Sequence, residues 1–415
     1  MVVVYPMRRL TLLGSTGSIG TSTLDVVRRR RDRFEVFALV AGKNSRLLAR
    51  QIEEFRPAVA VVATESDRAN LISRLQEAGL PRTGWPELLH GASGRLAAAV
   101  APEADFVLSA IVGVAGLEAT YEAVRRRKTV GLANKEVLVA SGALIMEAAR
   151  ESGTELIPVD SEHNGAHQCL RAGRRAEVTR LYLTASGGPF RETPAGELRL
   201  VTPEQALNHP TWKMGPRITI DSATMMNKGF EVIEACWLFG FAPSQVTVVI
   251  HPQSSVHAMI EYVDGSLIAQ ISATDMRMPI QYALTYPERA EAPVPRLDWA
   301  EPRIWSFGPP DFARFPLLRL AYEAQEAGGS ATCTLNAADE IAVESFLERQ
   351  IPFPAVAEVV EETLSRVPVR RPQSICEVLE IDRESREVAR RLVRERVAGG
   401  SAEASHAAVL TRTQA

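Results

Sequence analysis

Apolar and polar residues follow two alternating rhythms along the first 155 residues. Short apolar runs of strand length recur between stretches that have the spacing of an amphipathic helix. The runs are LTLLG, EVFALVAG, AVAVVA, FVLSAIVG and KTVGLAN. Strands that alternate with helices form parallel sheets. The pattern therefore predicts an α/β fold whose N-terminal domain, residues 1–155, is a doubly wound, Rossmann-like sheet.

A looser mixture of strands and helices follows this domain. It predicts a central α+β domain over residues 156–290, with the strands RLYLTASGG, RITIDSA, QVTVVIHP and SLIAQISA. Residues 291–316 contain six prolines and predict an extended linker. Beyond the linker, apolar residues recur at helical spacing and predict a C-terminal helical bundle over residues 317–398. We expect a flexible tail over residues 399–415.

Composition narrows the classes of function. The chain has 415 residues and a net charge of −3, which gives no global basic field for nucleic acid. The charge-free stretch from Ala235 to Ile260 is interrupted by prolines and glutamines, so we expect no membrane span. The apolar run of MVVVYPMRR is too short for a secretory signal. Four well-separated cysteines suit reduced thiols, and we expect a cytoplasmic protein.

A turn with three glycines follows the first predicted strand. In GSTGSIG, Gly14, Gly17 and Gly20 allow the backbone to approach a ligand closely. The helix that begins there offers free N–H groups to a pyrophosphate, and Thr16 and Ser18 add hydroxyl donors. The turn predicts a dinucleotide site, with a purely structural turn as the alternative.

The second predicted strand indicates which dinucleotide is bound. An NAD site usually has an acidic residue after this strand, which holds the ribose 2′-hydroxyl. Here Gly42, Lys43 and Asn44 occupy that position. A cation and an amide would attract a 2′-phosphate, so the sequence predicts NADPH rather than NADH. The alternative is that Lys43 is an ordinary surface lysine.

Two carboxylates end the strand IPVD. Asp160 and Glu162 are two residues apart, so on a continuing strand both would point to one side. Paired acids at the carboxyl edge of a sheet suit a hard divalent cation with oxygen ligands. The alternative is a surface pair held in salt bridges.

The segment RITIDSATMMNKGFE adds an acid beside a candidate phosphate pocket. We expect a strand to end at Asp221 and a helix to carry Asn227, Lys228 and Glu231 close together. The pocket is completed by hydroxyl groups and backbone N–H groups from Ser222, Ser186, Gly187 and Gly188. For Ser222, a helix cap is the alternative, and it is compatible with phosphate binding.

Two further segments are candidates for ligand contact. LANKE places Lys135 just past a strand end, in the ligand crevice of a doubly wound sheet, with an ordinary helix-start lysine as the alternative. NHPTWKMG has no helical or strand period and predicts a flap with His209, Trp212 and Met214; the alternative for the indole is a local core plug. His257 is interpreted as a packed core histidine.

These motifs together resemble the 1-deoxy-D-xylulose 5-phosphate reductoisomerase family. The resemblance rests on GSTGSIG, AGKN, LANKE, PVDSEHN, ASGGPF, HPTW, DSATMMNKG, IHPQS and LNAADE, and extends from Leu10 to about Val397. It implies homodimers whose subunits have an NADPH domain, a catalytic domain and a helical bundle. It also implies the rearrangement and reduction of a small phosphorylated sugar-derived substrate, 1-deoxy-D-xylulose 5-phosphate, to 2-C-methyl-D-erythritol 4-phosphate with Mn²⁺ or Mg²⁺.

The resemblance assigns roles to residues at matching positions. The implied metal ligands are Asp160, Glu162 and Glu231. The implied substrate-binding residues are Ser186, Ser222, Asn227 and Lys228 at the phosphate, with Glu231 beside them, and Lys135, Ser161, Glu162 and His209 at the sugar-derived part. Lys135, Glu162 and His209 would be catalytic. NADPH would be held by Thr16, Gly17, Ser18, Ile19, Gly42, Lys43, Asn44, Asn134, Glu136 and Gly215, under a flap with Trp212 and Met214.

The chain departs from the family pattern at a few positions. Ala185 replaces a common glycine, Pro216 follows Gly215 where a residue with a free N–H is usual, and Asp339 stands where asparagine is frequent. Two other classes share part of the pattern. A semialdehyde dehydrogenase would need a nucleophilic cysteine, for which Cys169 and Cys236 lack an evident partner. A non-enzymatic NADPH sensor would not need three acids beside a phosphate pocket.

Overall fold

The computed structural model describes residues 6–212 and 214–412. The chain forms two compact units, each built from more than one segment. The first unit contains Met1–Leu138, Gly142–Tyr182 and Ser255–Ile304, and the second contains Val139–Ser141, Leu183–Ser254 and Trp305–Ala415.

A seven-stranded sheet forms the centre of the first unit. Its strands are β1 (Arg8–Leu13), β2 (Phe34–Val40), β3 (Val59–Val62), β4 (Glu87–His90), β5 (Phe106–Ser109), β6 (Thr129–Leu132) and β7 (Leu156–Pro158). All neighbours pair in parallel in the order β4–β3–β2–β1–β5–β6–β7. Leu10 pairs with Val36 on one side and with Phe106 on the other. The strand order reverses at β1, so the predicted doubly wound topology is confirmed and a ligand crevice is expected at the ends of β1 and β5.

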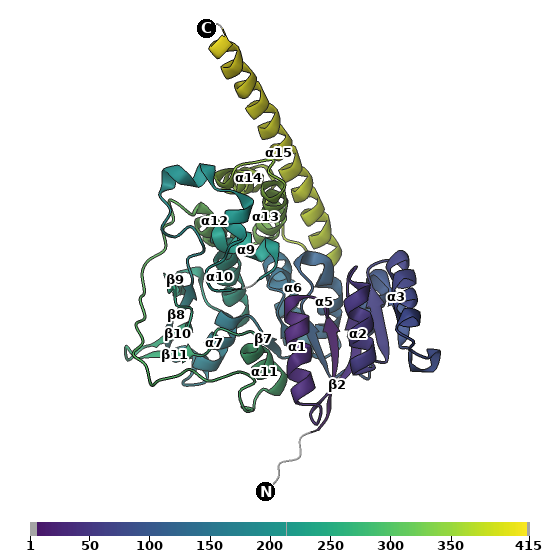
Figure 1. The fold of residues 1–415 in the computed structure, drawn as a ribbon. Coiled ribbons are helices and arrows are strands. Elements are labelled where there is room, and N and C mark those ends of the chain that lie inside the picture. The colour runs from purple at the N-terminus through teal and green to yellow at the C-terminus, as the bar shows by residue number, and fades with distance from the viewer. Residues whose placement is uncertain (1–5, 213, 413–415) are drawn as a thin grey trace. The chain divides into compact units, whose positions relative to one another are not determined.

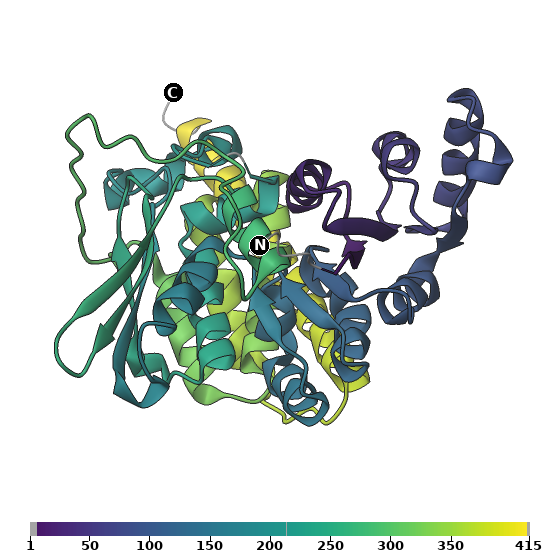
Figure 2. The same ribbon diagram turned by 90° about the horizontal axis from the view of Figure 1, so that it is seen from below.

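Helices cover both faces of this sheet (Figures 1 and 2). They are α1 (Ser18–Arg29), α2 (Ser45–Phe55), α3 (Glu65–Glu77), α4 (Gly91–Val100), α5 (Leu117–Arg125) and α6 (Glu136–Ser152). Residues on successive positions of a strand point to opposite faces, and the sheet accordingly separates two apolar clusters. Leu12 packs with α1 to α3, whereas Leu13 packs with α4 to α6. Burial on both faces explains why these strands are continuous apolar runs.

The rest of the first unit adds α7 (Ser161–Leu170), α11 (Arg277–Thr285) and the antiparallel strands β10 (Val256–Tyr262) and β11 (Leu267–Ile271). Ile280 and Leu284 of α11 join the apolar cluster that contains Leu12. A smaller sheet has the order β11–β10–β8–β9, in which β8 (Val178–Ala185) begins in the first unit and ends in the second. Strand β11 is therefore an edge strand.

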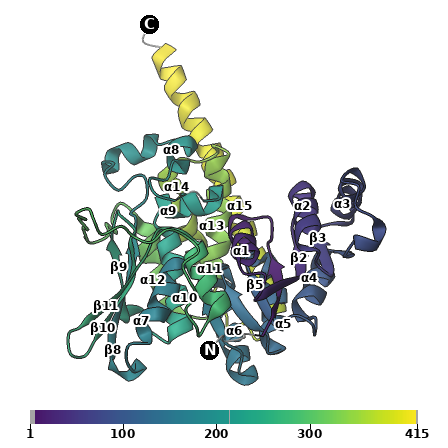
Figure 3. The same cartoon turned by 60° about the horizontal axis from the view of Figure 1, so that its bottom comes forward.

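The second unit is mainly helical (Figure 3). It contains β9 (Val246–Ile250) and the helices α8 (Pro203–Leu207), α9 (Pro216–Ala223), α10 (Met226–Phe239), α12 (Pro316–Ala327), α13 (Ala331–Leu347), α14 (Phe353–Arg366) and α15 (Ile375–Arg412). Short 3₁₀ turns are Arg82–Gly84, Gly113–Gly116, Arg175–Glu177, Ala195–Leu200 and Pro243–Gln245. The predicted helical bundle is confirmed, and α15 continues to Arg412 through residues for which the sequence predicts a tail.

The prediction of a strand at RITIDSA is wrong, because this segment is α9. Gly215 is its N-cap and Pro216 its first residue, a position where the missing N–H of proline costs nothing. Arg217 and Asp221 are four residues apart, which places them one turn apart on the same side of this helix, and Arg217 Nε lies 3.7 Å from Asp221 Oδ2. Ile218 and Ile220 alternate with polar residues as in a strand, but so short a pattern does not distinguish a strand from a buried helix. Strands β4 and β10 were not predicted.

Candidate active site

The glycine turn between β1 and α1 has a backbone that only glycine allows. Gly14 has a φ of +96°, and a Cβ atom on it would lie 2.5 Å from the carbonyl oxygen of Ala110. Gly17 is the N-cap of α1 and makes no side-chain cap, and both Gly17 and Ser18, the first residue of the helix, are exposed. An anion such as a pyrophosphate fits this helix N-terminus.

The carboxyl ends of β2 and β6 carry the other predicted cofactor residues of the first unit. Gly42, Lys43 and Asn44 are exposed, and the Asn44 side chain caps α2 by accepting a 3.1 Å hydrogen bond from Leu47 N. Asn134 is buried and donates to the carbonyl oxygens of Ile111 and Gly113, the latter at 2.9 Å. Glu136 Oε1 accepts from Gly113 N at 3.2 Å. Asn134 and Glu136 therefore hold the loop after β5.

Lys135 and Asp160 form an ion pair in the first unit, in which Lys135 is buried and Asp160 is partly buried. Strand β7 ends at Pro158, Asp160 is the N-cap of α7 and Glu162 lies in its first turn. The prediction that both acids share one side of a strand is wrong, because the chain turns into a helix between them. The Ser161 hydroxyl donates a 2.5 Å hydrogen bond to Glu162 Oε2. Negative charge is stabilised here by the N-terminal end of α7.

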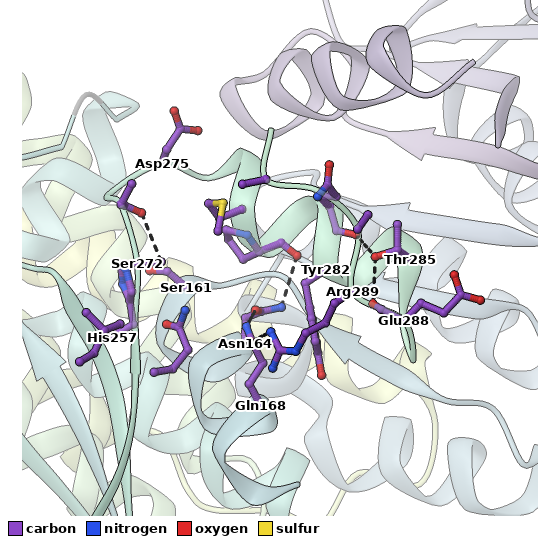
Figure 4. A pocket seen from close by; sticks show the side chains of 18 of the residues that line it. Ser161, Asn164, Gln168, His257, Ser272, Asp275, Tyr282, Thr285, Glu288 and Arg289 are labelled. Atoms are coloured by element: carbon purple, nitrogen blue, oxygen red, sulfur yellow. Dashed lines mark hydrogen bonds between the residues drawn. The ribbon is translucent and has the colours of Figure 1, made fainter. Parts of the chain in front are cut away.

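Sequence reasoning missed Asn164, which fixes the start of α7. Its buried side chain donates to the carbonyl oxygens of Pro158 at 2.8 Å and Pro279 at 3.3 Å. These bonds join the end of β7 to α11 and so position the turn that carries Asp160. Asn164 and Ser161 line a cavity of about 340 Å³ in this unit (Figure 4). One signal in the sequence could have indicated this role. Asn164 lies in the first turn of a helix that directly follows a strand, where an amide side chain can reach back to the end of that strand.

His209 bridges two of the predicted phosphate-binding hydroxyl groups in the second unit. Its Nε2 atom lies 3.1 Å from Ser186 Oγ and 3.1 Å from Ser222 Oγ. Its Nδ1 atom accepts hydrogen bonds from the backbone N–H groups of Thr211 and Trp212, at 3.1 and 2.9 Å. The proton of the neutral ring is therefore on Nε2. Burial lowers the pKa of His209 and favours this neutral form.

The two serines belong to adjacent segments that approach each other at a glycine. Gly188 has a φ of +69°, and a Cβ atom on it would lie 2.6 Å from the carbonyl oxygen of Ser222. Gly188 N donates a 3.2 Å hydrogen bond to Ser186 Oγ. A hollow of about 720 Å³ lies here, lined by the chain from Gly188 to Thr193 and by Asn208 to Pro210. Ser222 is not a helix cap, since the N-caps of α9 and α10 are Gly215 and Met225.

The first turns of α10 hold the predicted acid and its neighbours as expected. Asn227 donates a 2.7 Å hydrogen bond to Glu231 Oε1, and Lys228 forms an ion pair with Glu231 Oε2. Lys228 is 3% exposed and Glu231 1%. A buried carboxylate needs a cationic partner. The two carboxylate oxygens of Glu231 can bind a divalent cation as well as the ammonium group of Lys228.

The flap residues have irregular backbone, as predicted. Trp212 and Met214 are both partly exposed, so Trp212 does not fill a core in this structure. Gly215 is exposed and is the N-cap of α9. His257 is 4% exposed, in agreement with its interpretation as a packed histidine.

Comparison with known proteins matches almost the whole chain. Three family models, for 1-deoxy-D-xylulose 5-phosphate reductoisomerase and its C-terminal domains, match residues 10–142, 156–239 and 271–388. A curated reductoisomerase of this name from Solibacter usitatus is 69% identical over 95% of this chain and 99% of its own length. The chain belongs to the 1-deoxy-D-xylulose 5-phosphate reductoisomerase family.

Solved structures of the reductoisomerase agree with this result. The enzyme from Zymomonas mobilis in complex with NADPH is 45% identical, with a TM-score of 0.87 over 94% of this chain and 99% of that chain. A reductoisomerase in complex with NADPH, fosmidomycin and magnesium is 37% identical, with a TM-score of 0.87 over 94% and 98%. The expected activity is confirmed: the chain is an NADPH- and divalent-metal-dependent 1-deoxy-D-xylulose 5-phosphate reductoisomerase.

The two cysteines considered for a cysteine-dependent dehydrogenase are poor nucleophiles in this chain. Burial raises the pKa of both the Cys169 thiol and the Cys236 thiol to about 12, so neither forms a thiolate readily. Among the described residues, no helix is long and apolar enough to cross a bilayer.

Proposed function

We propose that Asp160, Glu162 and Glu231 bind the divalent cation of the reductoisomerase. The support is chemical: Asp160 and Glu231 are carboxylates with low exposure, and each is paired with a buried lysine, Lys135 or Lys228. Each carboxylate is shielded from water and needs a compensating positive charge, which a lysine ammonium group supplies in this structure. Hard oxygen donors of this kind are the ligands that Mg²⁺ and Mn²⁺ prefer.

The substrate phosphate is bound by the hydroxyl groups of Ser186 and Ser222 together with Asn227 and Lys228. The single observation that carries this assignment is the position of His209 Nε2, 3.1 Å from both serine oxygens. It brings two hydroxyl groups from separate segments to one point, where they can donate to phosphate oxygens. A reductoisomerase that binds magnesium together with fosmidomycin supports a substrate-analogue site in this family.

The remaining substrate contacts act on the carbon skeleton. The bound cation supplies Lewis-acid stabilisation of the negative charge that develops on the substrate oxygens. Lys135 and His209 orient the sugar-derived part, and Ser161 holds Glu162 through their 2.5 Å hydrogen bond. Glu162 is the proton carrier, and Lys135 stabilises developing oxyanions. Skeletal rearrangement by a retro-aldol and an aldol step precedes hydride transfer from NADPH.

The cofactor is held along the carboxyl edge of the seven-stranded sheet. Its pyrophosphate lies at the N-terminus of α1, beside Thr16 to Ile19, and its 2′-phosphate is recognised by Lys43 with Gly42 and Asn44. Asn134 and Glu136 support the loop after β5, and Gly215 belongs to the flap with Trp212 and Met214. A reductoisomerase from Zymomonas mobilis that binds NADPH and shares this fold supports the assignment.

The reductoisomerase acts as a cytoplasmic homodimer. Strand β11 is an edge strand with exposed apolar side chains, since Leu267 is 54% exposed, Ile268 38% and Ile271 37%. An apolar edge strand needs a cover, and a second copy of the chain supplies one. Sedimentation of the purified chain tests this, with Ile268→Lys expected to give monomers. The compartment is supported by four cysteines that form no disulfide bond.

One assay tests the assignment of substrate, cofactor and metal together. We expect loss of NADPH absorbance when 1-deoxy-D-xylulose 5-phosphate is added with Mn²⁺, and no loss after a chelator removes the metal. Ser222→Ala is expected to raise the Michaelis constant for the substrate and to leave that for NADPH unchanged. An unchanged Michaelis constant for the substrate in Ser222→Ala would show that Ser222 does not bind the phosphate.

A further inference from the structure

Two buried carboxyl groups face each other between α9 and α13 in the second unit. Asp339 of α13 has no exposed surface, and Asp221 of α9 is 4% exposed. Both lie beside the same guanidinium group, with Asp221 Oδ2 3.7 Å from Arg217 Nε and Asp339 Oδ2 3.9 Å from Arg217 Nη2. Neither oxygen of Asp339 receives a hydrogen bond from an N–H or O–H donor in the part of the chain that the structure describes. Two carboxylates cannot form a hydrogen bond with each other unless one carries a proton.

The neighbouring cations are engaged elsewhere. Arg217 Nη1 lies 2.8 Å from Glu340 Oε1, and Arg217 Nη2 donates a 3.0 Å hydrogen bond to Asn336 Oδ1. The same guanidinium group is 3.7 Å from Asp221 and 3.9 Å from Asp339, too far for hydrogen bonds. Its charge is thus largely compensated by Glu340.

A second arginine, from α15, does not supply the missing charge. Arg386 pairs with Glu340 Oε2 at 2.8 Å and with Asp382 Oδ2 at 2.7 Å. The network therefore contains four carboxyl groups, on Asp221, Asp339, Glu340 and Asp382, for two guanidinium groups. Ion pairs between α12 and α14, such as Arg319 with Glu361, lie at the exposed surface and do not compensate it.

We propose that Asp221 and Asp339 share one proton, and that the resulting hydrogen bond positions α9, the helix that carries Ser222. Asp339 holds the proton and donates it to Asp221, so that one charge of the pair is removed. Figure 3 shows α9 beside α13, which lets the bundle fix the orientation of α9. The effect on substrate binding rests on the proposed role of Ser222, whereas the shared proton does not.

Electrostatics agree with the geometry. Burial and the charge of Asp221 raise the pKa of Asp339 well above its ordinary value, against the opposing influence of Arg217. An acid whose pKa is higher in the folded state makes folding take up a proton at neutral pH. Its contribution to stability therefore falls as the pH rises from about 4 towards the folded pKa.

Substitution by asparagine isolates the shared proton. In the full chain, Asp339→Asn keeps a donor towards Asp221 but needs no proton. We expect the melting temperature of this variant, relative to the wild type, to rise with pH by roughly 2 °C for each unit between pH 5 and pH 8. Asp311→Asn is the control, because Arg314 and backbone N–H groups lower the pKa of the exposed Asp311. Its relative stability is not expected to grow with pH.

A difference for Asp339→Asn that stays flat or falls over the same range, as expected for the Asp311→Asn control, would mean that Asp339 is ionised and would overturn the proposal. Infrared spectra supply a second measurement that needs no activity. A protonated carboxyl band in the wild type at neutral pH is expected to be absent from Asp339→Asn. The same band in both proteins would assign the proton to a residue other than Asp339.

The positioning role is tested by a variant that cannot donate. Asp339→Leu is expected to raise the Michaelis constant for 1-deoxy-D-xylulose 5-phosphate by roughly tenfold, with the constant for NADPH unchanged and with rescue by Asp339→Asn. A wild-type substrate constant in Asp339→Leu would refute positioning through α9. If Ser222→Ala also leaves that constant unchanged, the fault lies in the proposed phosphate site, and the melting curves still decide on the proton.

Discussion

The backbone at Gly188 lies so close to Ser222 that no side chain fits between them. A Cβ atom on Gly188 would lie 2.6 Å from the carbonyl oxygen of Ser222 and 3.1 Å from Ala223 Cα, and the φ of Gly188 is +69°. Both the space and the backbone conformation therefore require glycine. The close approach brings Ser186 and Ser222 to the same imidazole nitrogen.

Replacing Gly188 by alanine should separate the two serines. We expect Gly188→Ala to lose about 2 kcal/mol or more of stability and to raise the Michaelis constant for the substrate about tenfold, because α9 must move away. Gly196→Ala is the matched control, since a Cβ atom there meets nothing within 4 Å. Denaturant unfolding and steady-state kinetics measure both effects. Equal behaviour of the two variants would contradict the role of the close approach.

The sequence predicted the seven-stranded sheet better than the segments around the substrate. Runs such as LTLLG are buried on both faces, so their apolar pattern has one interpretation. In α9, by contrast, Ile218 and Ile220 alternate like a strand although Pro216 and the spacing of Arg217 and Asp221 favour a helix. Local alternation over four residues could not decide between the two.

Spacing within one element was a reliable guide to the site, and spacing across an element boundary was not. Asn227, Lys228 and Glu231 contact each other as their positions on a helix predict. Asp160 and Glu162 do not follow a strand pattern, because the helix begins between them. The His209 bridge joins segments that are distant in sequence, and no local pattern contains it.

Reversing the charge of Lys43 should change the choice of cofactor. Lys43 is exposed at the end of β2, where the 2′-phosphate of NADPH is expected. In Lys43→Asp, an anion would repel that phosphate, and we expect the preference for NADPH over NADH to fall at least about tenfold. Arg50→Asp, an exposed change farther along α2, controls for net charge. Kinetics with both cofactors measure the ratio, and an unaltered ratio would place recognition of the 2′-phosphate elsewhere.

Removing the charge of Glu231 should weaken the metal site. Glu231 is 1% exposed and is held by Asn227 and Lys228, so its carboxylate has a fixed position. We expect Glu231→Gln to raise the Mn²⁺ concentration for half-maximal activity by about a hundredfold and to reduce turnover by a similar factor. Glu323→Gln, a surface change on α12, is the control, and circular dichroism checks the fold. Near-normal turnover at low Mn²⁺ would exclude Glu231 as a ligand.

His167 should make the stability of the first unit depend on pH. Its Nδ1 atom lies 2.8 Å from the Tyr282 hydroxyl, and Tyr286 packs against the ring at 5.0 Å. Burial, with a smaller effect of Arg171, lowers the pKa of His167 to about 4. Between pH 6.5 and pH 4 the unfolded chain therefore binds a proton that the folded chain does not, and stability falls as the pH falls.

The size of this effect follows from the difference between the two pKa values. It is at most about 3 kcal/mol, and partial exposure of the ring reduces it. His167→Gln keeps a polar group near Tyr282 but does not titrate, so its urea-unfolding free energy should lose less than the wild type between pH 6.5 and pH 4. The exposed His90, replaced by glutamine, is the control and should leave the wild-type slope intact. Parallel slopes for His167→Gln and the wild type would mean that His167 takes up its proton in the folded state.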